Sequence, residues 1–211
     1  MLDESLKEQI KKKFSKELKG KVDLILFGKD NECSFCSEYN ELVEEIAEQS
    51  EDVSSLHYAL SSPEAKEHGI EIAPSLLIYS PEHKTSATFC GPPGNHFFAI
   101  LIEDIVDASR GAPNISGKLI EEMKEINFPL RIRVFVSQTC PHCPPAVKVA
   151  HDFSLSNPNI HSEMIDGALF PQLRQKYRVM GVPKTVINDQ IELLGAQPPG
   201  EVLSKIRSLN K

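Results

Sequence analysis

The chain has 211 residues, of which 40% are hydrophobic and 25% are charged, and its net charge is −7 at pH 7. This length allows one large domain or two of common size, and the composition is typical of a globular protein with a buried core. The acidic balance argues against nucleic acid or an anionic membrane surface as a partner. The sequence shows neither a signal peptide nor an apolar run of membrane-spanning length, so we expect a cytoplasmic protein.

The first half of the chain is predicted to begin with an amphipathic helix, capped by Asp3 and ended by Gly20, and to continue with alternating strands and helices. In chain order we expect a strand at 22–28, a helix from Cys33 to about Gln49, a strand at 53–60, a helix capped by Ser62 and ended by Gly69, strands at 75–80 and 85–90, and a helix at 96–109.

The second half is predicted to repeat this order after a Gly- and Pro-containing segment at 110–114, and Ser116 is expected to cap its first helix. We expect helices at 117–127, from Cys140 to about 155, at 168–178 and at 199–209, and strands at 131–136, 159–165, 184–188 and 190–194.

The repeat divides the chain into two tandem domains, 1–115 and 116–211. The predicted class is α/β, in which each domain has a four-stranded mixed sheet flanked by helices and an extra N-terminal helix. Strands separated by helices should pair in parallel through right-handed crossovers, and the last two strands of each domain should form an antiparallel hairpin.

Two CxxC motifs stand at the same place in the two halves. Cys33-Ser34-Phe35-Cys36 and Cys140-Pro141-His142-Cys143 each follow an apolar strand and a polar turn, and each is expected to open a helix. Two cysteines one helical turn apart lie on one face, where they can close a small disulfide or open to a dithiol. In a cytosolic chain this pattern indicates redox or metal chemistry rather than a structural framework.

The position of each cysteine predicts its role in thiol–disulfide exchange. The thiolate is the reactive form, and a free cysteine with a pKa of about 8.5 is mostly protonated at neutral pH. The N–H groups and dipole of a helix N-terminus favour the thiolate of Cys33 and Cys140. Cys36 and Cys143, one turn inside the helix, should be the resolving thiols. The fifth cysteine, Cys90, is expected to be a buried small hydrophobic residue.

Each half also carries a proline directly before its hairpin, in Ala73-Pro74 and Val182-Pro183. With the CxxC motifs, these residues resemble the thioredoxin and glutaredoxin superfamily. The tandem arrangement resembles the glutaredoxin-like protein disulfide oxidoreductases of hyperthermophilic archaea and bacteria. The segments that add to the likeness are 91–94 (GPPG), 101–106 (LIEDIV), 110–111 (RG) and 194–198 (LGAQP).

The resemblance implies that both prolines are cis and that their loops face the CxxC pairs. It also implies that Ala73, Pro74, Val182 and Pro183 dock the substrate chain. Pro141-His142 is similar to the pair of strongly oxidising periplasmic disulfide-forming proteins, in which the histidine stabilises the thiolate. We therefore expect the C-terminal site to be the more oxidising and more active one. One departure is that the segments 24–28 and 132–136 have apolar residues where thioredoxins carry a buried acid before the CxxC.

Three functions remain open. The first is an enzyme, a protein dithiol–disulfide oxidoreductase that reduces, oxidises or isomerises disulfides in protein substrates. The second is a dedicated electron carrier from a flavin disulfide reductase to a peroxiredoxin, similar to the N-terminal portion of a bacterial flavoprotein in which the resemblance implies one active CxxC. The third is a zinc scaffold with four cysteine ligands. We expect no metal.

The sequence contains no GxGxxG, so we expect no cofactor beyond the redox-active disulfides. The reductant would then be external, such as a partner similar to thioredoxin reductase.

Overall fold

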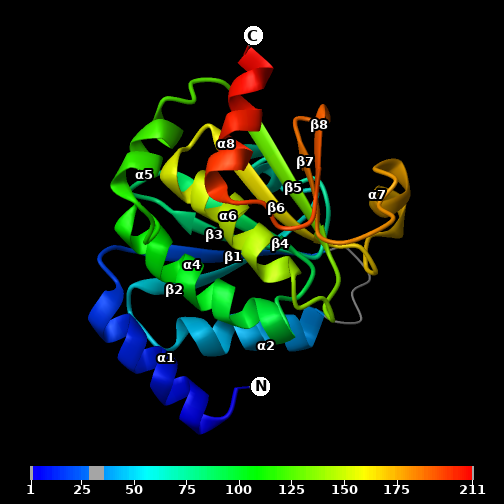
Figure 1. Cartoon of the computed structure of the whole chain (residues 1–211). Helices are drawn as coiled ribbons and strands as arrows, with labels where there is room; N and C mark the ends of the chain where they lie inside the picture. The colour runs from blue at the N-terminus through cyan, green and yellow to red at the C-terminus, as the bar shows by residue number, and fades with distance from the viewer. Residues whose placement is uncertain (1, 29–35, 211) are drawn as a thin grey trace.

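The computed structural model describes residues 2–28 and 36–210, which form helices packed on one central sheet (Figure 1). The helices are α1 (Glu4–Glu17), α2 (Cys36–Ala47), α3 (Pro63–Glu67), α4 (Phe98–Arg110), α5 (Gly117–Lys124), α6 (Cys143–Ser156), α7 (Pro171–Lys176) and α8 (Pro199–Arg207), with short 3-10 turns η1 (Asn95–Phe97) and η2 (Ser208–Asn210). The strands are β1 (Val22–Gly28), β2 (Val53–Ala59), β3 (Ser75–Ser80), β4 (Thr85–Cys90), β5 (Leu130–Val136), β6 (Ile160–Asp166), β7 (Lys184–Ile187) and β8 (Ile191–Leu194).

The local signals of the sequence account for most of these boundaries. The side chains of Asp3, Ser62 and Ser116 each accept a hydrogen bond from a backbone N–H in the first turn of α1, α3 and α5, as their capping role requires. Gly111 ends α4 in the left-handed conformation, with φ 66°. The predicted helix start at Cys33 lies outside the described residues, and α2 is described from Cys36 onward.

The strands of each half follow one order, β2-β1-β3-β4 in the first and β6-β5-β7-β8 in the second. β1 pairs in parallel with β2, and β5 pairs in parallel with β6. β3–β4 and β7–β8 are antiparallel hairpins. The predicted parallel pairing of the first two strands of each half and the closing hairpins are therefore confirmed. The expected parallel direction of the third strand is wrong, because β3 pairs antiparallel with β1 and β7 pairs antiparallel with β5.

The expectation of two separate four-stranded sheets is wrong, because the strands form one eight-stranded sheet in the order β2-β1-β3-β4-β6-β5-β7-β8. The halves join where β4 pairs in parallel with β6, through 88–90 and 163–165. Each of these strands would otherwise leave a row of unpaired N–H and C=O groups at a sheet edge. Pairing them satisfies both edges within one chain.

One large hydrophobic core lies on the helical face that carries α1, α2, α4, α5, α6 and α8, and it contains residues of both halves. These helices lie in front of the sheet in Figure 1. Two smaller clusters lie under α7 and α3 on the opposite face. Among the described residues, no helix is both long and apolar enough to cross a membrane.

Strand pairing brings the strand ends that adjoin the CxxC motifs and the two hairpin prolines to one edge of the sheet. A continuous row of paired residues runs across this edge: Phe27, Ser75, Cys90, Ile165, Phe135, Lys184 and Leu194. The loop that follows β5 and the prolines that precede β3 and β7 therefore share this edge.

Candidate redox site

The second CxxC motif lies at this edge, between the end of β5 and the start of α6. The chain turns through 137–142, and this turn is closed by a hydrogen bond of 3.0 Å from the Cys140 N–H to the Ser137 carbonyl oxygen. Cys140 and Cys143 form a disulfide with their Cα atoms 5.5 Å apart. The spacing of three residues thus brings the two sulfur atoms together, as the sequence predicts.

The two cysteines differ in exposure. Cys143 is fully buried, with 0% of its surface accessible, whereas Cys140 is half-buried. Of the two residues, only Cys140 is therefore partly accessible to a partner protein, and Cys143 is enclosed by the chain. This geometry can support nucleophilic attack by Cys140 followed by resolution by Cys143. His142, between them, is exposed at the N-cap of α6.

The prediction that Cys140 opens the helix is wrong, because α6 begins at Cys143. Residues 140–142 form a turn, in which the Cys143 N–H points to the Cys140 carbonyl oxygen at 3.4 Å. Pro144 and Pro145 then occupy the first turn of the helix, where a missing N–H breaks no helical hydrogen bond. These two prolines also remove donors that could otherwise stabilise a thiolate on Cys140.

Both predicted docking loops have cis peptide bonds, at Ala73-Pro74 and at Val182-Pro183. The loops differ in exposure: Ala73 is buried, at 3%, whereas Val182 is exposed, at 37%. Phe135, one residue before the end of β5, pairs with Lys184, which directly follows Pro183. The structure thus brings the Val182-Pro183 loop to the same sheet edge as Cys140. Cys33 and the side chain of Cys36 lie outside the described residues.

Gln138 connects the loop before Cys140 to the first half of the chain. Its Nε2 donates to the carbonyl oxygen of Pro92, at 3.0 Å, and to Oδ2 of Asp166, at 3.1 Å. Pro92 directly follows the Cys90-Gly91 end of β4. The position of the redox loop therefore depends on residues from both halves.

Cys90 is the remaining described cysteine, and it is free and buried at the end of β4. It packs with Phe135 and Ile165 in the cluster under α7. Burial, with a smaller contribution from Glu163, raises the pKa of its thiol strongly. The expectation of a buried small hydrophobic residue is confirmed.

Sequence reasoning missed a buried polar cluster between α4 and α6. Nζ of Lys148 lies 3.0 Å from Asp104, 2.7 Å from Asp107 and 2.5 Å from Asp152. Nδ1 of His151 lies 2.6 Å from Asp104, and both of these side chains are fully buried. The i,i+4 spacing of Lys148 and Asp152 was the available signal, but the sequence could not show which residues of α4 would face them.

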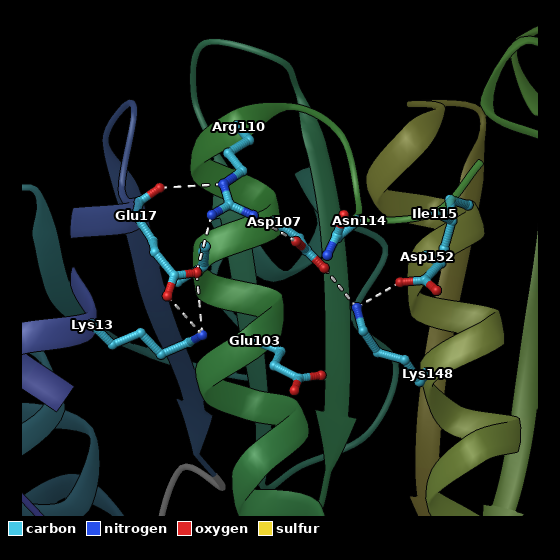
Figure 2. A pocket seen from close by; sticks show the side chains of 10 residues that line it. Lys13, Glu17, Glu103, Asp107, Arg110, Asn114, Ile115, Lys148 and Asp152 are labelled. Carbon is cyan, nitrogen blue, oxygen red and sulfur yellow. Dashed lines mark hydrogen bonds and ion pairs between the residues drawn. The ribbon is translucent and has the colours of Figure 1, made fainter. Parts of the chain in front are cut away.

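Figure 2 shows how this cluster continues to the N-terminal helix around a cavity of about 200 Å³. Charges alternate along a chain of ion pairs from α1 through α4 to α6. The members in order are Lys13, Glu17, Arg110, Asp107, Lys148 and Asp152. The redox helix α6 is thereby joined directly to α4, and through Arg110 of α4 to α1.

The electrostatics of the cluster follow from its burial. Desolvation raises the pKa of Asp152 to about 6, and the attraction of Lys148 opposes this shift. The pKa of Lys148 is raised because the three aspartates outweigh its own desolvation. Asp104, Asp107 and Asp152 come close enough to share a metal ion. The ammonium group of Lys148 instead lies within hydrogen-bond distance of all three, where it supplies the positive charge.

Comparisons with known proteins agree with this geometry. Residues 130–208 match the thioredoxin domain family. The chain has a thioredoxin-like fold. Over 97% of its length it superposes on the NTD_N/C domain of alkylhydroperoxide reductase AhpF from Enterococcus faecalis, with a TM-score of 0.85, 24% identity and 99% of that chain covered. It also superposes on a protein disulfide oxidoreductase from Aeropyrum pernix, with a TM-score of 0.84 and 22% identity, covering 99% of this chain and 94% of that one.

Sequence comparison points to the same group of proteins. The chain is 31% identical over 209 residues to the alkyl hydroperoxide reductase AhpF of Staphylococcus epidermidis and 30% identical to that of Staphylococcus aureus. These matches cover 99% of the chain but 38% of the length of each relative. The predicted likeness of fold to a protein disulfide oxidoreductase is confirmed.

Proposed function

We propose that this protein exchanges dithiols and disulfides with protein partners, and that Cys140–Cys143 is its principal site. The observation that carries the proposal is the contrast between a half-exposed Cys140 and a fully buried Cys143 at the edge that also holds the Pro183 loop. Cys33 and Cys36 would form a second site, in a unit 1–115 that repeats the strand order of the unit 116–211.

In the reducing direction, the Cys140 thiolate attacks one sulfur of a partner disulfide. This forms a mixed disulfide with Cys140 and expels the other partner sulfur as a thiolate. The Cys143 thiolate then attacks the sulfur of Cys140, which closes the Cys140–Cys143 disulfide and releases the partner as a dithiol. Two electrons pass to the partner, and an external flavin disulfide reductase in the cytoplasm would return them. The docking role proposed for Ala73, Pro74, Val182 and Pro183 and the thiolate-stabilising role of His142 complete this site.

A second candidate function is that of an electron carrier from a flavin disulfide reductase to a peroxiredoxin. The match to alkyl hydroperoxide reductase AhpF over nearly the whole chain favours it. A zinc scaffold with four cysteines is disfavoured by the sheet order, in which β3, β4 and β6 separate the strands that lead into the two motifs. Four strand spacings correspond to about 19 Å, whereas Zn–S bonds measure about 2.3 Å.

The test compares two substrates for the full chain, supplied with electrons from dithiothreitol. Reduction of insulin would support the general oxidoreductase, whereas turnover restricted to a peroxiredoxin would support the carrier. Cys140→Ser should abolish most of the activity and Cys33→Ser should remove less. If Cys140→Ser retained near wild-type turnover on both substrates, Cys140–Cys143 would not be the principal site.

A further inference from the structure

Gln138 makes the side-chain hydrogen bonds that join the loop around Cys140 to the rest of the chain. This loop, 137–142, connects the end of β5 to α6. Nε2 of Gln138 donates to the carbonyl oxygen of Pro92, at 3.0 Å, and to Oδ2 of Asp166, at 3.1 Å. No other side chain of the loop forms a hydrogen bond with described residues outside it. The position of Cys140 therefore depends on this one amide.

The chemistry of these contacts requires an amide. The Pro92 carbonyl group only accepts hydrogen bonds, and both oxygens of Asp166 act as acceptors, since its Oδ1 receives the Ala168 N–H at 2.9 Å. The group between them must therefore supply two donors, which the NH2 group of glutamine does without adding a charge. The Oε1 atom of Gln138 is buried and accepts no hydrogen bond from the described residues. The two bonds of Nε2 thus decide the orientation of the side chain.

Both partners of Gln138 belong to well-anchored parts of the molecule. Asp166 is the last residue of β6, where it pairs with Val136, and it is buried. Pro92 follows Gly91, which has a φ of 102° and little room for a side chain, because a Cβ atom there would lie 3.1 Å from the Cβ of Asp166. These groups are therefore packed together where the two halves of the chain meet.

The turn that contains Gly91 and Pro92 is also anchored to the helix of the other CxxC motif. The hydroxyl group of Tyr39 donates to the Gly91 carbonyl oxygen at 3.3 Å. Tyr39 is buried on α2, which is described from Cys36 onward. Two consecutive carbonyl groups thus each bind one side chain, one from α2 and one from the loop before α6. The first half of the chain therefore supplies part of the support for the second redox loop.

We infer that Gln138 is a positioning residue for the closing step at the second site, in which the Cys143 thiolate attacks the sulfur of Cys140. The inference rests on the proposed function. In this step an S–S bond forms between the two cysteines, the bond from Cys140 to the partner sulfur breaks, and the partner leaves as a thiolate. Cys143 is fully buried, so it depends on the loop to bring the Cys140 sulfur to it. Without the bonds of Gln138 the loop presents this sulfur less often, which slows an intramolecular attack.

The test follows both steps with the aromatic disulfide dithiobis(nitrobenzoate), which releases a yellow thiolate at each step. The protein is the reduced full chain that carries Cys33→Ser and Cys36→Ser. The first release, by Cys140, depends on the reagent concentration, and the second, by closing of the disulfide, does not. In Gln138→Leu the second rate should fall about tenfold and the first should change less than about twofold, because the two bonds that hold the loop are lost. Gln172→Leu replaces an exposed glutamine of α7 and should change neither rate.

Two further variants separate positioning from a loss of the fold. In Gln138→Glu a carboxylate meets two acceptors, so closing should be as slow as in Gln138→Leu. In Gln138→Glu/Asp166→Asn the new amide can donate to the new carboxylate, so closing should be about threefold faster than in Gln138→Glu alone. A lost fold would instead release a third thiolate from Cys90, which is free and buried in the native chain.

Equal closing rates in Gln138→Leu and Gln172→Leu, or a Gln138→Glu variant that Asp166→Asn does not accelerate, would overturn the role of Gln138 and leave the proposed function intact. If the parent protein showed no release that is independent of the reagent concentration, Cys143 would not be the resolving thiol, and the proposed function itself would fail.

Discussion

Nδ1 of His151 lies 2.6 Å from Oδ2 of Asp104, with both side chains fully buried between α6 and α4. Oδ1 of the same carboxylate lies 3.0 Å from Nζ of Lys148. Asp104, in the first half of the chain, therefore binds two residues of the redox helix of the second half. A buried carboxylate with two such partners should be important for stability.

Replacement of Asp104 with asparagine should lower the free energy of unfolding by about 3 kcal/mol, because it removes the charged partner of buried His151 and one of the three carboxylates around Lys148. Urea denaturation would measure the loss. Glu103→Gln is the matched control, since Glu103 is an exposed neighbour on α4, and it should change stability by less than about 0.5 kcal/mol. Equal stability of the two variants would contradict a stabilising role for Asp104.

Asp152 should make stability depend on pH in the acidic range. Its pKa is raised by burial to about 6 in the folded chain, above its usual value of 3.8. Between these values the folded state binds more protons than the unfolded state, so the contribution of Asp152 falls as pH rises through this window and is constant above it. The stability of the wild type relative to Asp152→Asn should therefore decrease by roughly 3 kcal/mol between about pH 3 and pH 7.

Denaturation curves at several pH values would measure this difference. A constant difference between the two proteins across the range would show that Asp152 titrates normally. The prediction depends on Asp104, Asp107 and Lys148, which face the Asp152 carboxylate and remain in place in both proteins.

Removal of the resolving thiol should trap the reaction half-way. In Cys143→Ser, Cys140 is half-exposed and can still attack, but no buried thiol remains to release the partner. A mixed disulfide with insulin or a peroxiredoxin should accumulate and be visible on a non-reducing gel and by mass spectrometry. Cys140→Ser is the control and should form no adduct at this site. Adducts of equal yield in both variants would assign the attack to another cysteine.

Pro144→Ala should lower the pKa of Cys140. The alanine restores one N–H in the first turn of α6, next to Cys143, which is disulfide-bonded to Cys140. A hydrogen bond to a charged group contributes about 1.5 kcal/mol, so a decrease of roughly one pH unit is expected. The pH dependence of alkylation of Cys140 would report it, with Pro171→Ala in the first turn of α7 as the control. No shift would mean that the new N–H does not reach the sulfur.

Cys90 should resist alkylation in the native protein. It is 1% exposed, and burial keeps its pKa far above neutral. After reduction, iodoacetamide should modify Cys140 but leave Cys90 unmodified until urea is added, as peptide mass spectrometry would show. Rapid modification of native Cys90 would show that the end of β4 opens in solution.

Much of the fold could be predicted from local signals in the sequence. Apolar runs locate the strands to within about two residues, and Asp3, Ser62 and Ser116 correctly predict the caps of α1, α3 and α5. The pairing of β4 with β6 was not predictable, because nothing local distinguishes an edge that stays free from one that another strand covers. The sequence predicts that α6 starts at Cys140 rather than at Cys143, because Pro141 suits a first helical turn as well as Pro144 and Pro145 do.

The candidate site was predictable to the extent that spacing defines it. The Cys140–Cys143 disulfide follows from a separation of three residues, and the position of Pro183 at the same edge follows from the repeated hairpin. The partners of His151 and Lys148 were not predictable, because they lie on α4, more than forty residues away in the sequence.

The single eight-stranded sheet also constrains electron transfer between the two CxxC segments. Three strands separate β1 from β5, the strands that lead into these segments. Four strand spacings correspond to a distance of about 19 Å. A shared core on one face and the pairing of β4 with β6 hold these strands in place at the described junction of the halves. We therefore expect electrons to pass between the two pairs through a third thiol rather than directly, so that the two pairs can have different reduction potentials.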